Sequence, residues 1–369
     1  MKYREFGKTG LKVSALGFGT MRLPLLEDGV TVDEKEAVRI IRHAIDSGVN
    51  YVDTAYPYHQ GTSEIVVGKA LRDGYRDKVF LADKSPIWKL EKESDFDSIL
   101  EEQLQKLQTD HIDFYLLHAL NKERFEKIKN LHLIDHMLEA RKAGKIRYLG
   151  FSFHDDLEVF KQIVDYTDQW DFCQIQYNYI NRAYQAGDEG LTYAAEKGLA
   201  VIIMEPLLGG RLANLSEHVA EVFSQDKTSV EHALDFLWDK KEVSLLLSGM
   251  GTEQQVEDNL VYAGRSAVGM LTAEEKKQYE KAKEIYDKMS MVDCTGCAYC
   301  MPCPFGLNIP ELFKAYNTYG PEGKDGMKRE YEKQQVRSDS CRSCHRCEKV
   351  CPQNIKISEQ MKKIAEMMK

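Results

Sequence analysis

Four polar side chains, each at or shortly after the end of an apolar run, could together protonate a carbonyl oxygen. They are Asp53, Tyr58, Lys84 and His118. A tyrosine with its usual pKa of about 10 is a poor proton donor near neutral pH, but a nearby ammonium stabilises the phenolate and lowers that pKa. A carboxylate can hold the ammonium in place, and a histidine can orient a carbonyl oxygen. The set therefore suits a reaction in which a hydride attacks a carbonyl carbon.

Eight of the nine cysteines fall into two runs of four, each followed by a proline: Cys294, Cys297, Cys300 and Cys303, then Cys341, Cys344, Cys347 and Cys351. The second run has the C-x₂-C-x₂-C-x₃-C-P spacing that binds 4Fe–4S clusters, and the first is one residue shorter before its last cysteine. In this pattern three thiolates wrap one cluster and the fourth turns to the neighbouring cluster. We therefore expect two clusters, with Cys351 completing the first and Cys303 the second. The alternatives are a single cluster and structural zinc, which usually takes paired C-x₂₋₄-C knuckles.

The four polar residues must be positioned by the first two thirds of the chain, where short apolar runs alternate with amphipathic stretches. Eight runs are strand candidates: 15–21, 50–55, 78–84, 112–118, 146–152, 171–177, 199–206 and 243–250. Several are continuously apolar, as parallel strands buried on both faces are. Eight strand–helix units over about 250 residues predict a (β/α)₈ barrel, with its active site at the C-terminal ends of the strands. A doubly wound sheet is the alternative, but GFGTMR (17–22) lacks the third glycine of the dinucleotide-binding motif.

A second, smaller domain is predicted after the barrel. Thr272 and Glu275 form a capping box that begins a helix, and the first cysteine run follows that helix. We place the barrel in residues 1–290 and a ferredoxin-like iron–sulfur domain in 291–369. Residues 317–340 are polar and charged, which favours an exposed connection between the cysteine runs, with room for a short helix.

Composition argues against several other classes of protein. The net charge of −9 disfavours nucleic acid as a partner. No apolar run approaches the roughly 20 residues that span a bilayer, and the first residues have no signal-peptide core. We therefore expect a cytoplasmic protein without a membrane partner, and clustered cysteines there more often bind metal than form disulfides.

The motifs DTAYPYHQGTSE (53–64), LADK (81–84), DFYLLH (113–118), GFS (150–152) and QIQYN (174–178) closely resemble the aldo-keto reductases. The resemblance covers residues 1 to about 290 and implies a barrel that binds a nicotinamide cofactor without a Rossmann unit. Tyr58 would then be the general acid, tuned by Lys84 and Asp53, with His118 orienting the substrate. The cofactor contacts implied are Ser152, Gln174, Met204, Gly249, Met250, Gly251, Thr252, Gln255 and Asn259. The cysteine runs resemble a two-cluster 4Fe–4S ferredoxin domain.

Three positions depart from the pattern of that family. Phe153 and His154 follow GFS, where an asparagine is usual, so one amide contact is lost. Met204 stands where many members stack a tyrosine on the nicotinamide; its thioether can pack against that ring or belong to the core. GMGTEQQVEDN (249–259) contains no lysine or arginine, which members that prefer the 2′-phosphorylated cofactor carry there. The sequence therefore favours NAD(H) over NADP(H).

These observations predict an NAD(P)H-dependent aldo-keto reductase that interconverts an aldehyde or ketone and its alcohol. The small-molecule substrate is not indicated by the sequence. The clusters could exchange electrons with a redox partner protein, sense oxidation or support the structure, and no flavin signature is present. The alternative is an electron-transfer or redox-regulatory protein in which the barrel mainly binds NAD(P)H.

Overall fold

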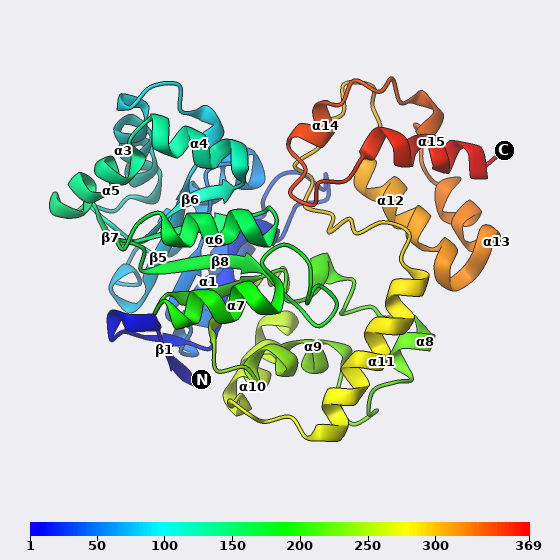
Figure 1. Cartoon of the computed structure of the whole chain (residues 1–369), viewed down its shortest axis with the longest axis horizontal. Helices are drawn as coiled ribbons and strands as arrows, with labels where there is room; N and C mark the ends of the chain where they lie inside the picture. Colours follow the sequence, from blue (N-terminus) through cyan, green and yellow to red (C-terminus); the bar gives the residue numbers. More distant parts are fainter. The chain divides into compact units, whose positions relative to one another are not determined.

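The computed structural model describes residues 1–369 and forms two compact units (Figure 1). The first comprises Met1–Pro206 and Leu234–Met270, and the second comprises Leu207–Ala233 and Leu271–Lys369. The second unit thus includes a segment that follows a barrel strand as well as the cysteine-rich part of the chain. The division into domains at residue 290 stays a prediction.

Eight parallel strands close into a barrel in the first unit, as the sequence predicts. They are β3 (Leu16–Gly19), β4 (Tyr51–Asp53), β5 (Phe80–Ser85), β6 (Ile112–Leu120), β7 (Ile146–Phe153), β8 (Phe172–Gln176), β9 (Ala200–Met204) and β10 (Val243–Ser248). Each pairs with its neighbour in sequence, and β10 closes the ring against β3. The closed barrel confirms the expected fold class and excludes the doubly wound sheet.

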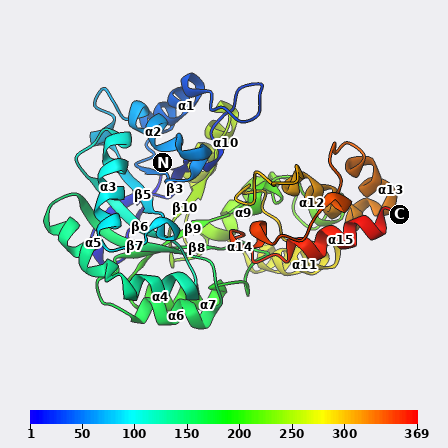
Figure 2. The ribbon, with the colours of Figure 1, turned by 90° about the horizontal axis from the view of Figure 1, so that it is seen from above.

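Helices surround the barrel strands in the first unit (Figure 2). They are α1 (Glu34–Asp46), α2 (Ser63–Ala70), α3 (Ser94–Leu107), α4 (Lys122–Asn130), α5 (Leu133–Lys142), α6 (Leu157–Asp165), α7 (Gly187–Glu196) and α10 (Glu253–Arg265). Helix α9 (Ser229–Trp238) crosses from the second unit into the first. Helix α1 illustrates why these segments are helical: the Asp33 side chain caps it by accepting a hydrogen bond from the Glu36 amide, and Ile40 and Ile41 face the core.

An N-terminal hairpin, which the sequence analysis did not identify, precedes the barrel. Strands β1 (Tyr3–Glu5) and β2 (Lys12–Ser14) pair in antiparallel fashion. Phe6, between them, is fully buried, with its ring centroid 4.5 Å from that of Phe114 and 6.5 Å from that of Tyr51. Because these partners lie near the beginnings of β6 and β4, Phe6 fills the N-terminal end of the barrel, opposite the strand ends that carry the polar residues.

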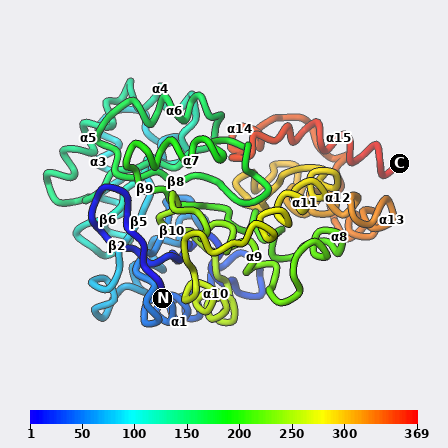
Figure 3. Tube along the Cα trace, turned by 60° about the horizontal axis from the view of Figure 1, so that its bottom comes forward, coloured from blue at the N-terminus to red at the C-terminus, as the bar shows by residue number.

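The second unit is helical. It contains α8 (Glu217–Ala220), α11 (Ala273–Met289), α12 (Ile309–Asn317), α13 (Tyr319–Tyr331), α14 (Arg346–Lys349) and α15 (Ile357–Met367). The capping box of Thr272 and Glu275 begins α11 as predicted. Helices α12, α13 and α15 lie together in Figures 1 and 3, and Leu312, Met327 and Met361 meet in their shared core.

Residues 317–340 are mostly exposed or half-buried, as expected, and the short helix allowed for there extends over 13 residues. Residues 319–331 form α13, in which Met327 and Tyr331 are buried one helical turn apart. Two apolar anchors at that spacing suffice to hold a helix against the core although the remaining residues are polar. None of the chain's helices combines the length and apolar character needed to cross a membrane.

Candidate functional site

Asp53 and Lys84 lie on the neighbouring parallel strands β4 and β5, at their C-terminal ends. The Lys84 Nζ atom is 2.5 Å from Asp53 Oδ1, 2.7 Å from the Thr54 carbonyl oxygen and 3.4 Å from the Tyr58 phenol oxygen. Lys84 is 1% exposed and Asp53 2%. Burial raises the pKa of Asp53 and the Lys84 charge opposes that shift. The ammonium is therefore held by a carboxylate and a carbonyl while it also contacts the phenol.

Tyr58 and His118 complete this group of four. Tyr58 begins a short turn (Tyr58–Gly61) after β4, and His118 is on β6. Their ring centroids are 6.2 Å apart in an edge-to-face arrangement. Burial, followed by the positive charge of Lys84, holds the pKa of His118 well below its usual range. His118 is consequently neutral near pH 7 and can donate one ring N–H to a carbonyl oxygen.

A buried polar network behind Lys84 was missed by the sequence analysis. The Gln103 amide nitrogen, on α3, is 2.8 Å from Glu64 Oε1, 2.8 Å from Asp83 Oδ2 and 3.1 Å from the Lys84 carbonyl oxygen. Tyr115 donates a 2.6 Å hydrogen bond to the Gln103 carbonyl oxygen. Burial and then the Glu64 charge raise the pKa of Asp83 well above its usual range. The network fixes the backbone that carries Lys84. In the sequence, the one sign of this network was a glutamine within the apolar stripe of α3.

Ser152 and Gln174 stand opposite each other on β7 and β8, where a nicotinamide carboxamide was expected. The Ser152 hydroxyl accepts a 2.7 Å hydrogen bond from the Ala119 amide, so its own proton is available to a carbonyl oxygen. The Gln174 carbonyl oxygen is buried and has no hydrogen-bond partner in the chain. An unsatisfied buried acceptor is costly, and a primary amide would satisfy it. The pair fits the carboxamide, and Met204 lies nearby at the end of β9, half-buried.

The segment after β10 forms a compact turn into α10. The Gln255 side chain accepts a 2.8 Å hydrogen bond from the Gly251 amide, and Thr252 caps the helix. Asn259 donates a 3.0 Å hydrogen bond to the Ser248 hydroxyl. The structure thus brings together six of the predicted cofactor residues: Gly249, Met250, Gly251, Thr252, Gln255 and Asn259.

Basic residues on α1 contact the acidic residues of this segment. The sequence of the segment alone could not show these contacts. Arg39 contacts both carboxylate oxygens of Glu253, at 2.5 and 3.0 Å. His43 lies 3.4 Å from Glu257. Arg265, the only basic residue of α10, contacts buried Asp235 at 3.1 Å. Arg39 is thus engaged by Glu253 and also by Glu36. The Arg22 side chain lies against Gly249.

His154, two residues after Ser152, makes stability depend on pH. Burial lowers the pKa of His154 to about 4. An unfolded histidine takes up its proton near pH 6.5, so between these values the unfolded chain binds more protons and stability falls as pH falls. Between pH 7 and pH 5, the free energy of unfolding should fall by about 2 kcal/mol less in His154→Gln than in the wild type. Urea unfolding of both proteins at the two pH values tests this, and equal losses would contradict it.

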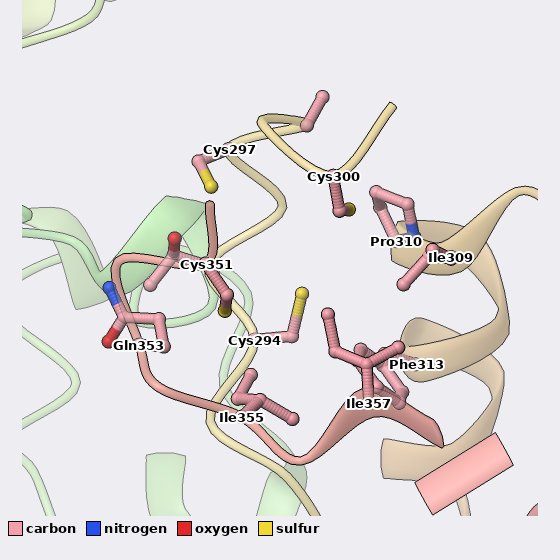
Figure 4. A pocket seen from close by; sticks show the side chains of 12 residues that line it. Cys294, Cys297, Cys300, Ile309, Pro310, Phe313, Cys351, Gln353, Ile355 and Ile357 are labelled. Carbon is pink, nitrogen blue, oxygen red and sulfur yellow. The ribbon is translucent and has the colours of Figure 1, made fainter. Parts of the chain in front are cut away.

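Four cysteines from both runs line one cavity in the second unit (Figure 4). Three come from the first run (Cys294, Cys297 and Cys300), and the fourth, Cys351, comes from the second. Their sulfur atoms project into the same space, whose remaining walls are largely apolar, including Ile355 and Ile357. This is the grouping that crossed fourth ligands require.

The electrostatics of this cavity suit a positively charged inorganic group. Burial, followed by repulsion from Cys297, Cys294 and Cys351, raises the pKa of the Cys300 thiol. Four neighbouring thiolates therefore need a cationic centre among them. No three of the chain's His, Cys, Asp or Glu side chains lie close enough together to hold a single metal ion. The four sulfur atoms that line the cavity are ligands of the kind that a cubane cluster takes.

Three of the remaining four cysteines lie against the helical core of the second unit, and Cys344 is exposed. Cys303, Cys341 and Cys347 pack against that core. Burial and then the charges of Glu348, Cys341 and Cys344 raise the pKa of Cys347 to about 11. That Cys303 is the fourth ligand beside Cys341, Cys344 and Cys347 stays a prediction.

Within the second unit, the loop that follows β9 is hydrogen-bonded to the residues just before the first cysteine run. Arg211 donates hydrogen bonds to the Val292 carbonyl oxygen, at 3.1 Å, and to the Ser290 hydroxyl, at 2.8 Å. Gly209 has a φ of 66°, and any side-chain carbon there would collide with the Thr295 backbone. Glycine is required at this position, and the loop rests directly on the residue after Cys294.

Comparison with known proteins finds two family patterns along the chain. The Aldo/keto reductase family pattern matches residues 15–284. The chain belongs to this family. A 4Fe-4S dicluster domain matches residues 290–355. The protein is therefore an aldo/keto reductase family oxidoreductase that carries a C-terminal 4Fe–4S dicluster domain, and members of this family bind a nicotinamide cofactor.

Several aldo/keto reductases are similar to this chain. The aldo-keto reductase YhdN of Bacillus subtilis (strain 168) is 32% identical over 227 residues, 58% of this chain and 64%, just under two thirds, of its own length. L-galactose dehydrogenase of Arabidopsis thaliana is 30% identical over 286 residues, 70% of this chain and 87% of its own. The solved structure of an aldo-keto reductase from Klebsiella pneumoniae in complex with NADP and acetate is 26% identical, covers 76% of this chain and 94% of its own, and has a TM-score of 0.60.

Proposed function

We propose that the barrel interconverts an aldehyde or ketone and its alcohol. The observation that carries this proposal is the buried Lys84 ammonium, in contact with both the Asp53 carboxylate and the Tyr58 phenol. A bound nicotinamide supplies or accepts the hydride. Tyr58 holds the proton for the carbonyl oxygen, Lys84 stabilises the phenolate left behind, and neutral His118 orients that oxygen by donating a hydrogen bond.

The chemistry of the side chains supports Ser152 and Gln174 as the residues that hold the carboxamide. The buried Gln174 oxygen accepts from an amide N–H, and the Ser152 hydroxyl donates to the amide carbonyl. Met204, at the end of β9, is proposed to pack against the ring, and the turn at Gly249–Asn259 to contact the rest of the cofactor. These contacts fix the ring orientation but supply no proton.

Turnover with a panel of aldehydes and ketones, with NADH and NADPH, tests the proposed reaction. The alternative, an electron-transfer or redox-regulatory protein, predicts reduction of the clusters by a viologen dye and no carbonyl turnover. Alcohol formation that depends on the nicotinamide supports the proposal, and its absence across the panel would contradict it.

We propose NADH as a cofactor used at least as well as NADPH, although the related Klebsiella structure holds NADP. A 2′-phosphate needs a guanidinium or ammonium partner, and Arg39 is occupied by Glu253. Arg39 also contacts both carboxylate oxygens of Glu36, at 2.7 and 2.8 Å. Glu253→Gln leaves Arg39 with Glu36 as its remaining carboxylate partner and should raise the NADPH-to-NADH ratio of kcat/KM by roughly tenfold. Glu257→Gln removes the same charge without touching Arg39 and serves as the control. A strong wild-type preference for NADPH would contradict this proposal.

We propose two 4Fe–4S clusters with crossed ligands. Cys294, Cys297, Cys300 and Cys351 hold one, which the shared cavity supports. Cys341, Cys344, Cys347 and Cys303 hold the other. The clusters belong to a domain that begins at residue 291, and a redox partner protein is the proposed source or acceptor of single electrons.

A further inference from the structure

The segment that carries the second cysteine run is basic, although the chain as a whole is acidic. Residues 337–356 contain five arginine or lysine residues and two acidic residues, whereas the whole chain has a net charge of −9. The five basic residues, all of them exposed, are Arg337, Arg342, Arg346, Lys349 and Lys356. This segment therefore carries a charge opposite in sign to that of the rest of the chain.

Most of this positive charge has no partner within the chain. Arg337 lies over the Tyr331 ring, with its guanidinium carbon 6.0 Å from the ring centroid. The side chains of the other four basic residues form no ion pair or hydrogen bond within the chain. Asp339, the one exposed acidic residue of the segment, stands in the short turn Ser338–Ser340. Four cationic groups are thus available to a partner.

The second acidic residue of the segment, Glu348, holds the basic residues together. Its carboxylate contacts the His345 ring at 2.9 Å and accepts a 2.8 Å hydrogen bond from the Ser358 amide. Because Glu348 is on α14 and Ser358 is in the first turn of α15, this bond ties the two helices together. Lys356, directly before α15, is thereby kept close to the basic residues of α14.

The second cysteine run reaches the surface among these basic residues. Cys344 is the only exposed cysteine of the chain, and in sequence it lies between Arg342 and Arg346. Val350 adds an apolar side chain that is 42% exposed. Since electron transfer weakens steeply with distance, a cluster whose ligands reach the surface exchanges electrons best with a partner that binds at that surface.

We propose that this basic face, formed by Arg342, Arg346, Lys349 and Lys356, binds an acidic protein that carries single electrons. The inference rests on the proposed iron–sulfur clusters and names the surface and the charge of the redox partner. Opposite charges speed the encounter of two proteins, and complexes of electron carriers are typically small and weak. The carrier loses one electron and the cluster of the second run gains it, or the reverse, and no bond forms or breaks.

Binding of two carriers of opposite charge tests the proposal. A plant-type 2Fe–2S ferredoxin is acidic and cytochrome c is basic, and both carry single electrons. Calorimetric titration of the anaerobically purified whole chain should detect binding of the ferredoxin. Arg342→Gln combined with Arg346→Gln should weaken that binding by roughly tenfold at low ionic strength and should not weaken binding of cytochrome c.

A matched control and a second variant separate the charge of the face from assembly of the cluster. Lys277→Gln combined with Lys281→Gln removes the same charge from exposed positions of α11, which lies apart from α14 in Figure 1, and should leave ferredoxin binding unchanged. Lys349→Gln combined with Lys356→Gln removes the same charge outside the C-x₂-C-x₂-C part of the run. This variant should weaken ferredoxin binding by a similar factor while the iron content stays the same.

Three results would overturn the inference and leave the proposed clusters in place. They are no ferredoxin binding by protein that holds about eight iron atoms per chain, equal ferredoxin binding by the wild type and both basic-face variants, and tighter binding to phosphatidylserine vesicles than to the ferredoxin. The last result would assign the face to an anionic membrane surface. Protein without iron would instead contradict the proposed clusters, and the inference with them.

Discussion

Tyr58→Phe is expected to lower kcat for carbonyl reduction by about 10²–10⁴-fold, because the substitution removes only the proton donor. The contacts of Lys84 with Asp53 and with the Thr54 carbonyl do not involve the phenol and should remain. Nicotinamide binding, followed by fluorescence, should therefore change little. Steady-state kinetics with a neutral aldehyde under anaerobic conditions measures the loss.

Tyr56→Phe is a matched control for this prediction. It removes the same hydroxyl two residues earlier, where the phenol contacts Lys89 at 3.1 Å and Glu102 at 3.4 Å. This control should retain most of the activity. A loss of less than tenfold in Tyr58→Phe, or an equal loss in both variants, would remove Tyr58 from the role of general acid.

Cys351→Ala is expected to halve the iron content, from about eight to about four atoms per chain, because it removes the fourth ligand of the cluster held by the first run. The loop pinned to that run by Arg211 should then exchange its amide hydrogens faster over residues 207–214. Cys303→Ala should lose the same amount of iron but leave exchange in that loop close to that of the wild type. Iron analysis of anaerobically purified protein and hydrogen exchange measure the two effects.

Cys173→Ala provides the control for the cysteine variants. Cys173 is a buried thiol on β8, outside both runs, and its replacement should leave the iron content unchanged. If Cys303→Ala accelerates exchange at residues 207–214 and Cys351→Ala does not, each run binds its own metal centre. The crossed arrangement would then be wrong.

The sequence predicts the barrel and the placement of its four polar residues because both follow from local patterns. The apolar runs overlap all eight strands. The parallel pairing of β4 with β5 brings Asp53 and Lys84 together at the C-terminal end of the barrel. The shared cavity of Cys351 and the first run likewise follows from their spacing. These features depend on periodicity and on short motifs, which a single sequence contains.

Features that depend on contacts between distant segments could not be predicted in this way. Arg39 meets Glu253 across 214 positions of the chain, so the charge of the cofactor turn could not be read from that turn alone. Gln103 appears as one polar residue on an apolar helix face, and its role emerges only when Asp83 and Glu64 are placed beside it.

The fate of the transferred hydrogen tests whether the barrel transfers a hydride from NADH to a carbonyl carbon. Benzaldehyde is incubated anaerobically with NADH that carries deuterium at both C4 positions, and the alcohol is analysed by NMR. Hydride transfer at this site should give one deuterium at the benzylic carbon in the wild type, and almost no product in Tyr58→Phe. Benzyl alcohol without deuterium at that carbon, or equal labelled product from Tyr58→Phe, would contradict hydride transfer assisted by the Asp53, Tyr58, Lys84 and His118 site.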